Sequence, residues 1–447
     1  MVKIIFFSIK YDKIKKGVDN MHDKTSNSWL KLDNAATIYP STLSRKFAAM
    51  FRLAITLKED IDVDVLNTAL NNIIGRFPTF KYKLKKGLFW YYFKQINKKM
   101  VIEKDYNNPM LRINFKRNNN YMFRVRYYKN RIAIEYFHAL TDGYGGTVFI
   151  STLIGEYIRL KYKESITYNN YCLDPKSEAL EEEVRDDFYK YAKYDMKTSL
   201  EREEFAYHYK GSLENKNILN IITAIIPLKS LKELANEYEV TITVLLVSLF
   251  ISSIQEMYLN DNKKKNQQIK VSVPVNLRKY YNSKTMRNFS SYLNVGIDLK
   301  YGIYSFDEII KIVKNTMELN LTEKKLNAKF SANVKLTKNI FIRLMPLFVK
   351  KPLMSIVELM MGDRYATTTL SNLGIIKLPK EVEKYVEEIN FIIGRSRGKP
   401  SSCSCISYKD NLYLTFSRNI KESEFERIVL TKLVELNIPV LVESNRR

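Results

Sequence analysis

Two spacings of apolar residues recur along this chain, and they predict helices and strands in alternation. In residues 63–74 the apolar side chains recur at helical spacing, and Gly75 and Pro78 then end the helix. Residues 131–137 (RIAIEYF) alternate with a period of two, which is typical of a strand. The second half also alternates between strands and helices. We expect a strand at 219–228, helices at 231–238 and 240–259, and a strand at 269–275.

This alternation predicts an α/β or α+β protein with two lobes. We place an N-terminal lobe at residues 1–162, a helical connector at 163–216 and a C-terminal lobe at 217–447. The connector contains SEALEEEVRDDFYKYAKYDMK, in which acidic residues come first and basic residues later. That order suits a solvated helix, because it complements the helix dipole.

Two long apolar stretches need an interpretation. Residues 240–254 (VTITVLLVSLFISSI) are shorter than the ~20 residues that a spanning helix needs, so we expect a buried helix and no membrane span. Residues 341–361 (FIRLMPLFVKKPLMSIVELMM) are interrupted by two prolines and a lysine pair. One interpretation is a membrane-surface or acyl-chain-lining segment. The interruptions favour the other, two short core helices.

The chain of 447 residues is strongly basic, with a formal net charge of +25. Its hydrophobic content of 45% is enough for a buried core and excludes a disordered basic tail. Such a charge would suit a nucleic-acid-binding protein, but the lysines are dispersed and no nucleic-acid-binding motif occurs. We therefore interpret the charge as a Lys-rich solvated surface and expect no specific nucleic-acid partner.

Cysteine and histidine are scarce, with three residues of each. Cys403 and Cys405 are too close for an ordinary disulfide, and His22, His138 and His208 are not at metal-pair spacing. We predict no metal site and no disulfide framework. The first residues lack the pattern of a secretory signal, so we expect a cytoplasmic protein.

One motif points to chemistry. His138 follows the expected strand at 131–137 and begins HALTDGYGG, in which Asp142 and Gly143 come next in the pattern H-x-x-x-D-G. The glycines permit a tight turn that can hold the imidazole as a general base requires. The alternative is a strand-end histidine followed by ordinary turn chemistry. The pattern is rare in a chain with three histidines and 14 glycines, which favours the catalytic interpretation.

With this motif the chain resembles the CoA-dependent acyltransferase superfamily, whose members share the chloramphenicol-acetyltransferase-like fold. The resemblance extends to five further segments: LDNAATIYP (32–40), LNTALNNIIGRFPTFKYKL (66–84), PVNLRKYY (274–281), NFSSYLNVGID (288–298) and SNLG (371–374). The alcohol acetyltransferase branch is the most similar. Phe137 stands where condensation domains and wax-ester synthases usually have a second histidine, and the DFGWG motif of the plant enzymes is absent.

The resemblance implies two lobes, each a mixed sheet with flanking helices, and an active-site channel between them. It also implies an enzyme that moves an acyl group, in the simplest case acetyl, from acyl-CoA to the hydroxyl or amine of a small acceptor. His138 would be the general base in direct attack within a ternary complex. Acyl-CoA would be a co-substrate, and no cofactor would be bound permanently.

The resemblance also assigns supporting residues. A carboxylate four residues after His138 suits either a catalytic triad or a structural role, and the resemblance implies the structural one, with Arg278 as the partner of Asp142. Ser371 and Asn372 are candidates to stabilise the oxyanion, and Asn294 is a further candidate. The remaining candidates are in GRSRGKP, where Arg395, Arg397 and Lys399 would bind the CoA phosphates unless this loop is a solvated hairpin turn.

Three other functions stay open at the level of sequence. A condensation-type enzyme would take its acyl group from a phosphopantetheine thioester on a carrier protein. The chain could instead be a basic nucleic-acid-binding protein or a catalytically inactive binding protein of the same superfamily. The condensation-type enzyme and the expected acyltransferase would both turn over a thioester. The nucleic-acid-binding protein and the inactive binding protein would not.

Overall fold

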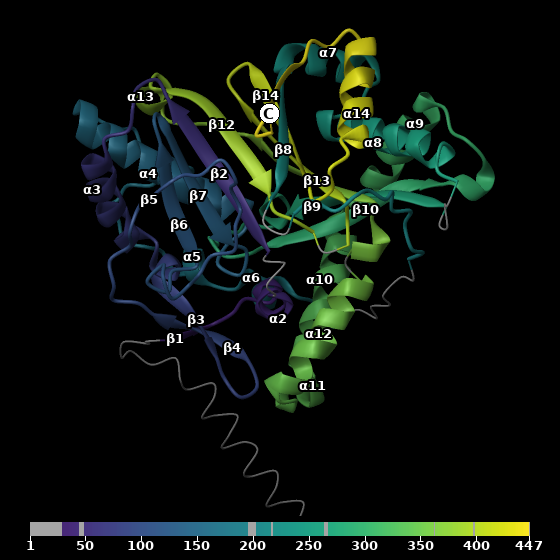
Figure 1. The fold of residues 1–447 in the computed structure, drawn as a ribbon. Helices are drawn as coiled ribbons and strands as arrows, with labels where there is room; N and C mark the ends of the chain where they lie inside the picture. Colours follow the sequence, from purple (N-terminus) through teal and green to yellow (C-terminus); the bar gives the residue numbers. More distant parts are fainter. Residues whose placement is uncertain are drawn as a thin grey trace, which may run out of the picture.

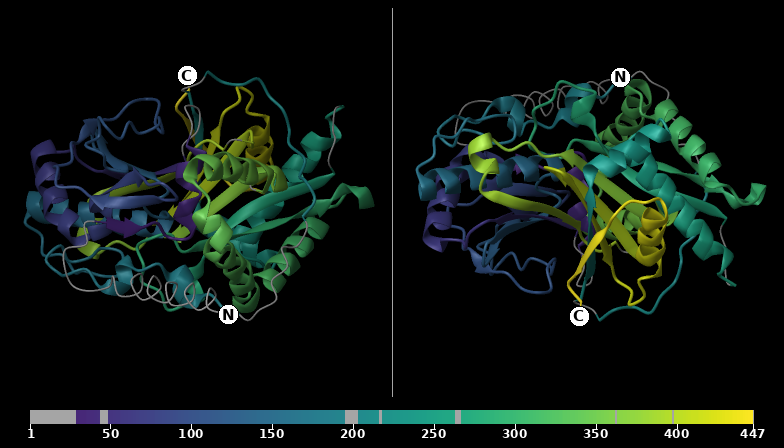
Figure 2. Two further views of the ribbon diagram at one scale, coloured as in Figure 1. Left: turned by 90° about the horizontal axis from the view of Figure 1, so that it is seen from below. Right: turned by 90° about the horizontal axis from the view of Figure 1, so that it is seen from above.

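The computed structural model describes residues 29–43, 49–194, 203–215, 218–262, 267–361, 363–396 and 398–446. His22 and Arg397 lie outside the described residues, as do parts of the expected connector. The chain forms two large sheets that lie side by side, with helices on their outer faces (Figures 1 and 2).

The first large sheet has five strands in the order β12-β2-β7-β6-β5. These strands are β2 (Met50–Leu57), β5 (Glu103–Lys104), β6 (Phe123–Tyr128), β7 (Arg131–Phe137) and β12 (Val386–Ile393). All neighbours are antiparallel except β5 and β6, so the sheet is mixed. Helices α3 (Val63–Ile73) and α4 (Gly143–Tyr162) flank it, and Phe80, Phe123 and Phe149 stack in the core between helix and sheet.

The second large sheet has seven strands in the order β10-β9-β11-β13-β14-β8-β15. They are β8 (Asn220–Pro227), β9 (Gln268–Asn276), β10 (Ser290–Asp298), β11 (Thr368–Ile375), β13 (Ser401–Tyr408), β14 (Asn411–Arg418) and β15 (Leu441–Ser444). Strand β11 is parallel to both of its neighbours, and the other pairs are antiparallel. The helices on this side are α7 (Leu228–Glu237), α8 (Ile242–Leu259), α9 (Phe306–Asn320) and α14 (Glu424–Glu435).

A small third sheet has the order β1-β4-β3 and lies below the first sheet in Figure 1. Its strands are β1 (Trp29–Lys31), β3 (Tyr82–Lys86) and β4 (Tyr91–Gln95). The remaining helices are α2 (Tyr39–Thr42), α5 (Glu181–Val184), α6 (Asp187–Tyr191), α10 (Glu323–Lys338), α11 (Ile340–Leu344), α12 (Leu347–Met361) and α13 (Lys380–Glu383). Short 3-10 turns occur at Ala35–Thr37, Ile74–Arg76, Pro78–Lys81, Leu277–Lys279, Leu299–Tyr301 and Asp363–Tyr365.

The predicted boundary at residue 217 needs one correction, because strand β12 from the expected C-terminal lobe pairs with β2 in the first sheet. Two serine hydroxyls of the second sheet bond this strand: Ser404 donates to the Phe391 carbonyl and Ser417 to the Ile393 carbonyl, each at 2.7 Å. The local sequence pattern predicts strands and helices but not this pairing of β12 with β2, because pairing between distant strands leaves no local signal. The C-terminal half of the chain therefore contributes one strand, β12, to the first sheet, and serines of the second sheet bond that strand.

Helix α8 agrees with the buried helix expected from the sequence. It is the one helix, among the residues that the structure describes, whose length and composition would let it cross a bilayer, and 67% of that window is buried inside the fold. Its apolar side chains pack in the core of the second lobe beside strands β9 and β14. Thr241 caps it by accepting a hydrogen bond from the Val244 amide at 3.2 Å.

Residues 341–361 do form two helices, α11 and α12, separated near Pro346, but most of the apolar side chains described up to residue 354 lie outside the core that we predicted. Phe341 is 80% exposed and Phe348 is 71% exposed, whereas Lys350 is buried. The two helices lie at one end of the molecule (Figure 1).

Candidate active site

The candidate site is built on the turn that follows β7. The backbone amide of His138 donates to the Ala49 carbonyl at 2.8 Å, which extends the pairing of β7 with β2 by one residue. Three residues later, the Thr141 hydroxyl donates to the Met286 carbonyl at 2.6 Å. The turn is therefore fixed at one end to the first sheet and at the other to a segment of the second lobe.

Two aromatic rings enclose the half-buried imidazole of His138. Tyr39, at the start of α2, stacks on it with centroids 4.7 Å apart and planes inclined by 22°. Phe51 meets it edge to face at 5.3 Å. These contacts restrict rotation of the ring, so its two nitrogens keep fixed directions.

Asn288 fixes which imidazole nitrogen carries the proton. Its Oδ1 lies 3.0 Å from His138 Nδ1, and its Nδ2 donates to Asp33 Oδ2 at 3.2 Å. Because a carboxylate can only accept, the amide must turn its NH2 toward Asp33 and its oxygen toward the imidazole. Nδ1 of His138 then carries the proton, and Nε2 keeps a lone pair with no hydrogen-bond partner among the described residues.

Asp33, which accepts the Asn288 hydrogen bond, interacts with a second carboxyl group, that of half-buried Asp186. Asp33 is fully buried, and burial raises its pKa while the Arg287 guanidinium, whose Nε is 3.6 Å from Asp33 Oδ2, opposes the rise. Burial, with the charge of Asp33 added, raises the pKa of Asp186 to about 7. Asp186 accepts hydrogen bonds from the amides of Asn34 at 2.9 Å and Phe188 at 3.1 Å. The pair therefore ties the segment of Asp33 to helix α6.

Asp142 points away from the imidazole and bonds groups of the second lobe. Its Oδ2 lies 2.8 Å from Arg278 Nη1 and accepts from the Phe289 amide at 2.9 Å. Its Oδ1 accepts from the Gly145 amide at 3.3 Å, which caps helix α4. Arg278 is the partner that the resemblance implies, and its other nitrogens donate to main-chain carbonyls of Thr285 and Arg287. This geometry suits a structural carboxylate rather than a member of a triad.

The glycines of the motif permit close approach to the second lobe. A Cβ on Gly145 would lie 2.2 Å from Thr141 Oγ1 and 2.3 Å from the Met286 carbonyl oxygen. A Cβ on Gly143 would lie 2.4 Å from a methyl group of Leu373. The motif is therefore packed directly against the SNLG segment, and a side chain at Gly145 would force the Met286 main chain to move.

Ser371 and Asn372, the two oxyanion candidates, lie on opposite faces of β11. Asn372 Nδ2 donates to Thr243 Oγ1 of helix α8 at 3.0 Å, and its Oδ1 accepts from the Gly374 amide at 2.7 Å. These bonds place Asn372 on the helix-covered face and stabilise the bulge at Gly374, whose φ is +76°. Ser371 points to the other face, because side chains alternate along a strand. Its strand neighbour Ser404 bonds β12 of the first sheet on that face.

Asn294 does not join the other candidates. Its Nδ2 donates to Glu203 Oε2 at 2.7 Å on strand β10. Asn288 contacts His138 just before that strand begins, and the four residues from Ser290 to Asn294 carry the chain about 13 Å further. Asn294 therefore lies farther along the chain than Asn288 and bonds Glu203, and its role at the oxyanion stays a prediction.

The GRSRGKP segment has internal partners. Arg395 donates to the main-chain carbonyls of Asn215 and Ile218. Lys399 is 8% exposed, donates to Thr369 Oγ1 at 2.9 Å and lies 3.8 Å from Asp363, and burial lowers its pKa. Lys399 is thus buried with internal partners, and its contact with the CoA phosphates stays a prediction. Arg397, the third predicted residue, lies outside the described residues.

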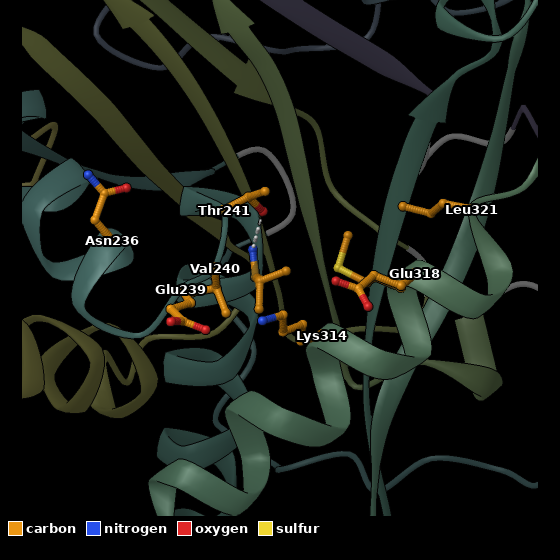
Figure 3. A pocket seen from close by; sticks show the side chains of 9 residues that line it. Asn236, Glu239, Val240, Thr241, Lys314, Glu318 and Leu321 are labelled. Atoms are coloured by element: carbon orange, nitrogen blue, oxygen red, sulfur yellow. Dashed lines mark hydrogen bonds between the residues drawn. The ribbon is translucent and has the colours of Figure 1, made fainter.

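Two cavities stand out, and both lie away from His138. One of about 400 Å³ lies between helices α8 and α9 and is lined in part by Thr241, Lys314 and Glu318 (Figure 3). The other, of about 430 Å³, lies between strands of the two large sheets and is lined in part by Arg52, Asn390 and Asn445. The active-site channel that the resemblance implies therefore stays a prediction.

Known proteins resemble this chain in their fold. No protein-family model matches the sequence, and no curated protein matches it. Solved structures do match. The trichothecene 15-O-acetyltransferase TRI3 from Fusarium sporotrichioides has a TM-score of 0.58 at 11% identity, over 93% of this chain and 96% of that one.

Two more solved structures match this chain over most of its length. The first condensation domain of the CDA synthetase has a TM-score of 0.56 at 12% identity, over 93% of this chain and 100% of that one. Polyketide synthase associated protein 5 from Mycobacterium tuberculosis has a TM-score of 0.55 at 12% identity, over 90% and 96% of the two chains. This chain has the fold that these three structures share, that of condensation domains.

Within the condensation-domain fold, the sequence missed two residues that touch His138, Tyr39 and Asn288, and the carboxylate Asp33 behind them. All three occur in segments that carried the resemblance, LDNAATIYP and NFSSYLNVGID. The segments that contain these residues were therefore recognisable in the sequence. Their contact with the histidine was not, because a tyrosine, an asparagine and an aspartate from distant segments have no spacing that relates them to it.

Proposed function

We propose that this protein is an acyltransferase that moves an acyl group from an acyl-CoA thioester to the hydroxyl or amine of a small acceptor. The observation that carries the proposal is the hydrogen bond between His138 Nδ1 and Asn288 Oδ1, which leaves Nε2 without a hydrogen-bond partner among the described residues. An alcohol is a poor nucleophile at neutral pH, and a neutral imidazole in this state can accept its proton.

The proposed reaction has one intermediate. Nε2 of His138 accepts the acceptor's proton while the acceptor oxygen or nitrogen attacks the thioester carbonyl carbon, and the carbonyl oxygen becomes an oxyanion. The C–S bond then breaks, and the proton on Nε2 passes to the departing thiolate. The products are an ester or amide and free CoA thiol, and His138 returns to its starting state without a covalent enzyme intermediate.

We assign the oxyanion to Ser371 rather than to Asn372. The hydroxyl of Ser371 is on the β11 face that is turned toward the first sheet, and Leu373, two residues later, packs against Gly143 of the motif. Asn372 already donates to Thr243 and accepts from Gly374. One oxyanion donor is typically worth roughly 2.7–4 kcal/mol of transition-state stabilisation.

The cysteines have no part in this scheme. Burial raises the pKa of Cys172 to about 12, and it raises the pKa of Cys403 and Cys405 as well, so no thiolate forms near neutral pH. No permanently bound cofactor enters the scheme either. In the carrier-protein alternative, the same His138 would act on a phosphopantetheine thioester, and the two donors differ only beyond the pantetheine arm.

The experiment is release of free thiol from acetyl-CoA and longer acyl-CoAs with a panel of alcohols and amines. Acceptor-dependent thiol release that yields a stoichiometric ester or amide supports the proposal. Transfer from an acylated carrier protein, with none from acyl-CoA, would instead assign the donor to the carrier. No transfer from either donor, together with salt-dependent nucleic-acid binding, would contradict the enzyme.

A further inference from the structure

One end of the molecule presents large apolar side chains to solvent. Helices α11 and α12 supply four of them, and the loop between β3 and β4 supplies two (Figure 1). We name this set the apolar tip: Leu88, Phe89, Ile340, Phe341, Leu344 and Phe348. Phe341 is 80% exposed, Phe348 71% and Leu88 67%. An exposed cluster of this kind is typical of an interaction site.

The two elements of the apolar tip are bonded to each other. The Leu347 amide donates to the Leu88 carbonyl at 2.8 Å, and Lys350 Nζ donates to the Phe89 carbonyl at 3.0 Å. The same ammonium group lies 3.3 Å from the centroid of the Trp90 ring. Lys350 is buried, so its charge serves this junction rather than the surface. The tip is thus a single prearranged surface, although its parts are some 250 residues apart in the sequence.

The two chain segments that contain the apolar tip carry charge of one sign. Between Asp64 and Glu103 the chain has eight cationic residues and no acidic one. Between Glu323 and Glu358 it again has eight cationic residues and no acidic one. These two segments contain the whole tip, and Lys85, Lys86, Arg343 and Lys351 are exposed beside it. The surface therefore complements a partner that has an apolar interior and a negatively charged outer layer.

We propose that the apolar tip docks the protein on an anionic lipid bilayer, with Phe341 and Phe348 inserted among the acyl chains and the neighbouring lysines at the headgroups. Apolar burial and attraction to anionic lipids are the two contributions that hold amphipathic helices in an interface. Each lysine or arginine near a negative leaflet adds to the second. The exposed side chains of the tip belong to two elements at one end of the molecule (Figure 1), which suits insertion better than a fit into a protein groove.

Docking at this end would bring the bilayer close to the candidate site. Met354 of α12 accepts a hydrogen bond through its sulfur from Ser41 Oγ of α2 at 3.7 Å. Helix α2 begins with Tyr39, whose ring stacks on His138. Only one short helix therefore separates α12 from the imidazole. The docking proposal itself stands on the apolar tip and its charge, and it holds whether or not the proposed reaction is correct.

The test is co-sedimentation of the full chain with vesicles of equimolar phosphatidylcholine and phosphatidylglycerol, beside vesicles of phosphatidylcholine alone. We expect binding to the anionic vesicles that weakens as NaCl is raised, because salt screens the lysines. Phe341→Ser with Phe348→Ser should weaken binding by at least about tenfold, since each change removes an inserted aromatic ring. The matched control is Tyr301→Ser with Ile303→Ser, at two exposed apolar positions beside β10 in the other lobe.

A second pair of variants tests the charge. Lys85→Glu with Lys86→Glu should weaken binding to anionic vesicles, whereas Lys229→Glu with Lys232→Glu, the same change on the exposed face of α7, should bind like the wild type. A thermal melt confirms that each variant folds. The proposal is overturned if the wild type does not bind anionic vesicles, or if the tip variants bind as tightly as their controls. Capture of an acidic carrier domain or of a second copy through the tip, without vesicle binding, would also overturn it.

Discussion

The Oδ1 atom of Asn288 lies 3.0 Å from Nδ1 of His138, and the other end of the same amide donates to Asp33. A neutral side chain thus occupies the place where hydrolytic triads put a carboxylate. The asparagine orients the imidazole and selects its tautomer, but it adds no negative charge beside the ring.

Replacing this amide by a carboxylate should change the pH dependence of the reaction. In Asn288→Asp, a negative charge beside Nδ1 favours the charged imidazolium, so the pH at which the acyltransferase rate is half-maximal should move upward. The pH profile of kcat/KM measures this. A profile that coincides with that of the wild type would show that Asn288 does not contact the working base.

Removing the amide should slow the reaction more than it weakens substrate binding. In Asn288→Ala the imidazole loses its only hydrogen-bonding partner among the described residues, so we expect a fall in kcat of at least about tenfold with little change in KM. The comparison of kcat and KM separates orientation from binding. An effect on KM alone would contradict the assignment of Asn288 as a positioning residue.

The ion pair between Asp142 and Arg278 should matter for folding. Both side chains are about 6% exposed, so Asp142→Ala leaves a buried guanidinium without its carboxylate, at a cost of about 3–5 kcal/mol. Denaturant unfolding measures this loss. Asp142→Ala in an Arg278→Met background should cost less than in the wild type, because the charge is then gone from both sides. Equal costs in the two backgrounds would show that the pair is not coupled.

Asp186 should make the protein less stable as the pH rises toward neutrality. Its folded-state pKa is raised to about 7, above the ordinary value of 3.8, so between these values the folded state binds more protons than the unfolded state. The free energy of unfolding then falls as pH increases from about 4 to above 7. Asp186→Asn should flatten this slope in unfolding experiments at several pH values. An unchanged slope would place the titration on another group.

Ser371 and Asn372 should respond differently to truncation. Ser371→Ala removes the proposed oxyanion donor and should lower kcat by about 10²–10³, with unchanged stability. Asn372→Ala removes bonds to Thr243 and Gly374 and should lower the melting temperature. Steady-state kinetics and a thermal melt on both variants give the comparison. A larger loss of kcat in Asn372→Ala at full stability would reverse the assignment.

The sequence predicts what short-range pattern can encode. The strand at 131–137 and the helix at 63–74 were expected almost residue for residue, because each buries one regular face. The motif and the pair of Asp142 with Arg278 followed from resemblance. The position of β12 in the first sheet and the contact of Asn288 with His138 could not be foreseen, since both depend on how distant segments meet. The exposure of Phe341 and Phe348 also differs from what we expected, because an apolar run of this kind is typical of a core helix.

The most direct test of the account is the rate of acyl transfer by His138→Ala, on a substrate pair that the wild type uses, with His208→Ala as the matched control. Both nitrogens of His208 lie 3.0 Å from main-chain carbonyl oxygens, of Ala206 and Asp363, and we give it no part in the chemistry. We predict that His138→Ala folds and loses acceptor-dependent thiol release by about 10²-fold or more, while His208→Ala keeps it. Turnover at the wild-type rate in His138→Ala would contradict the proposed mechanism.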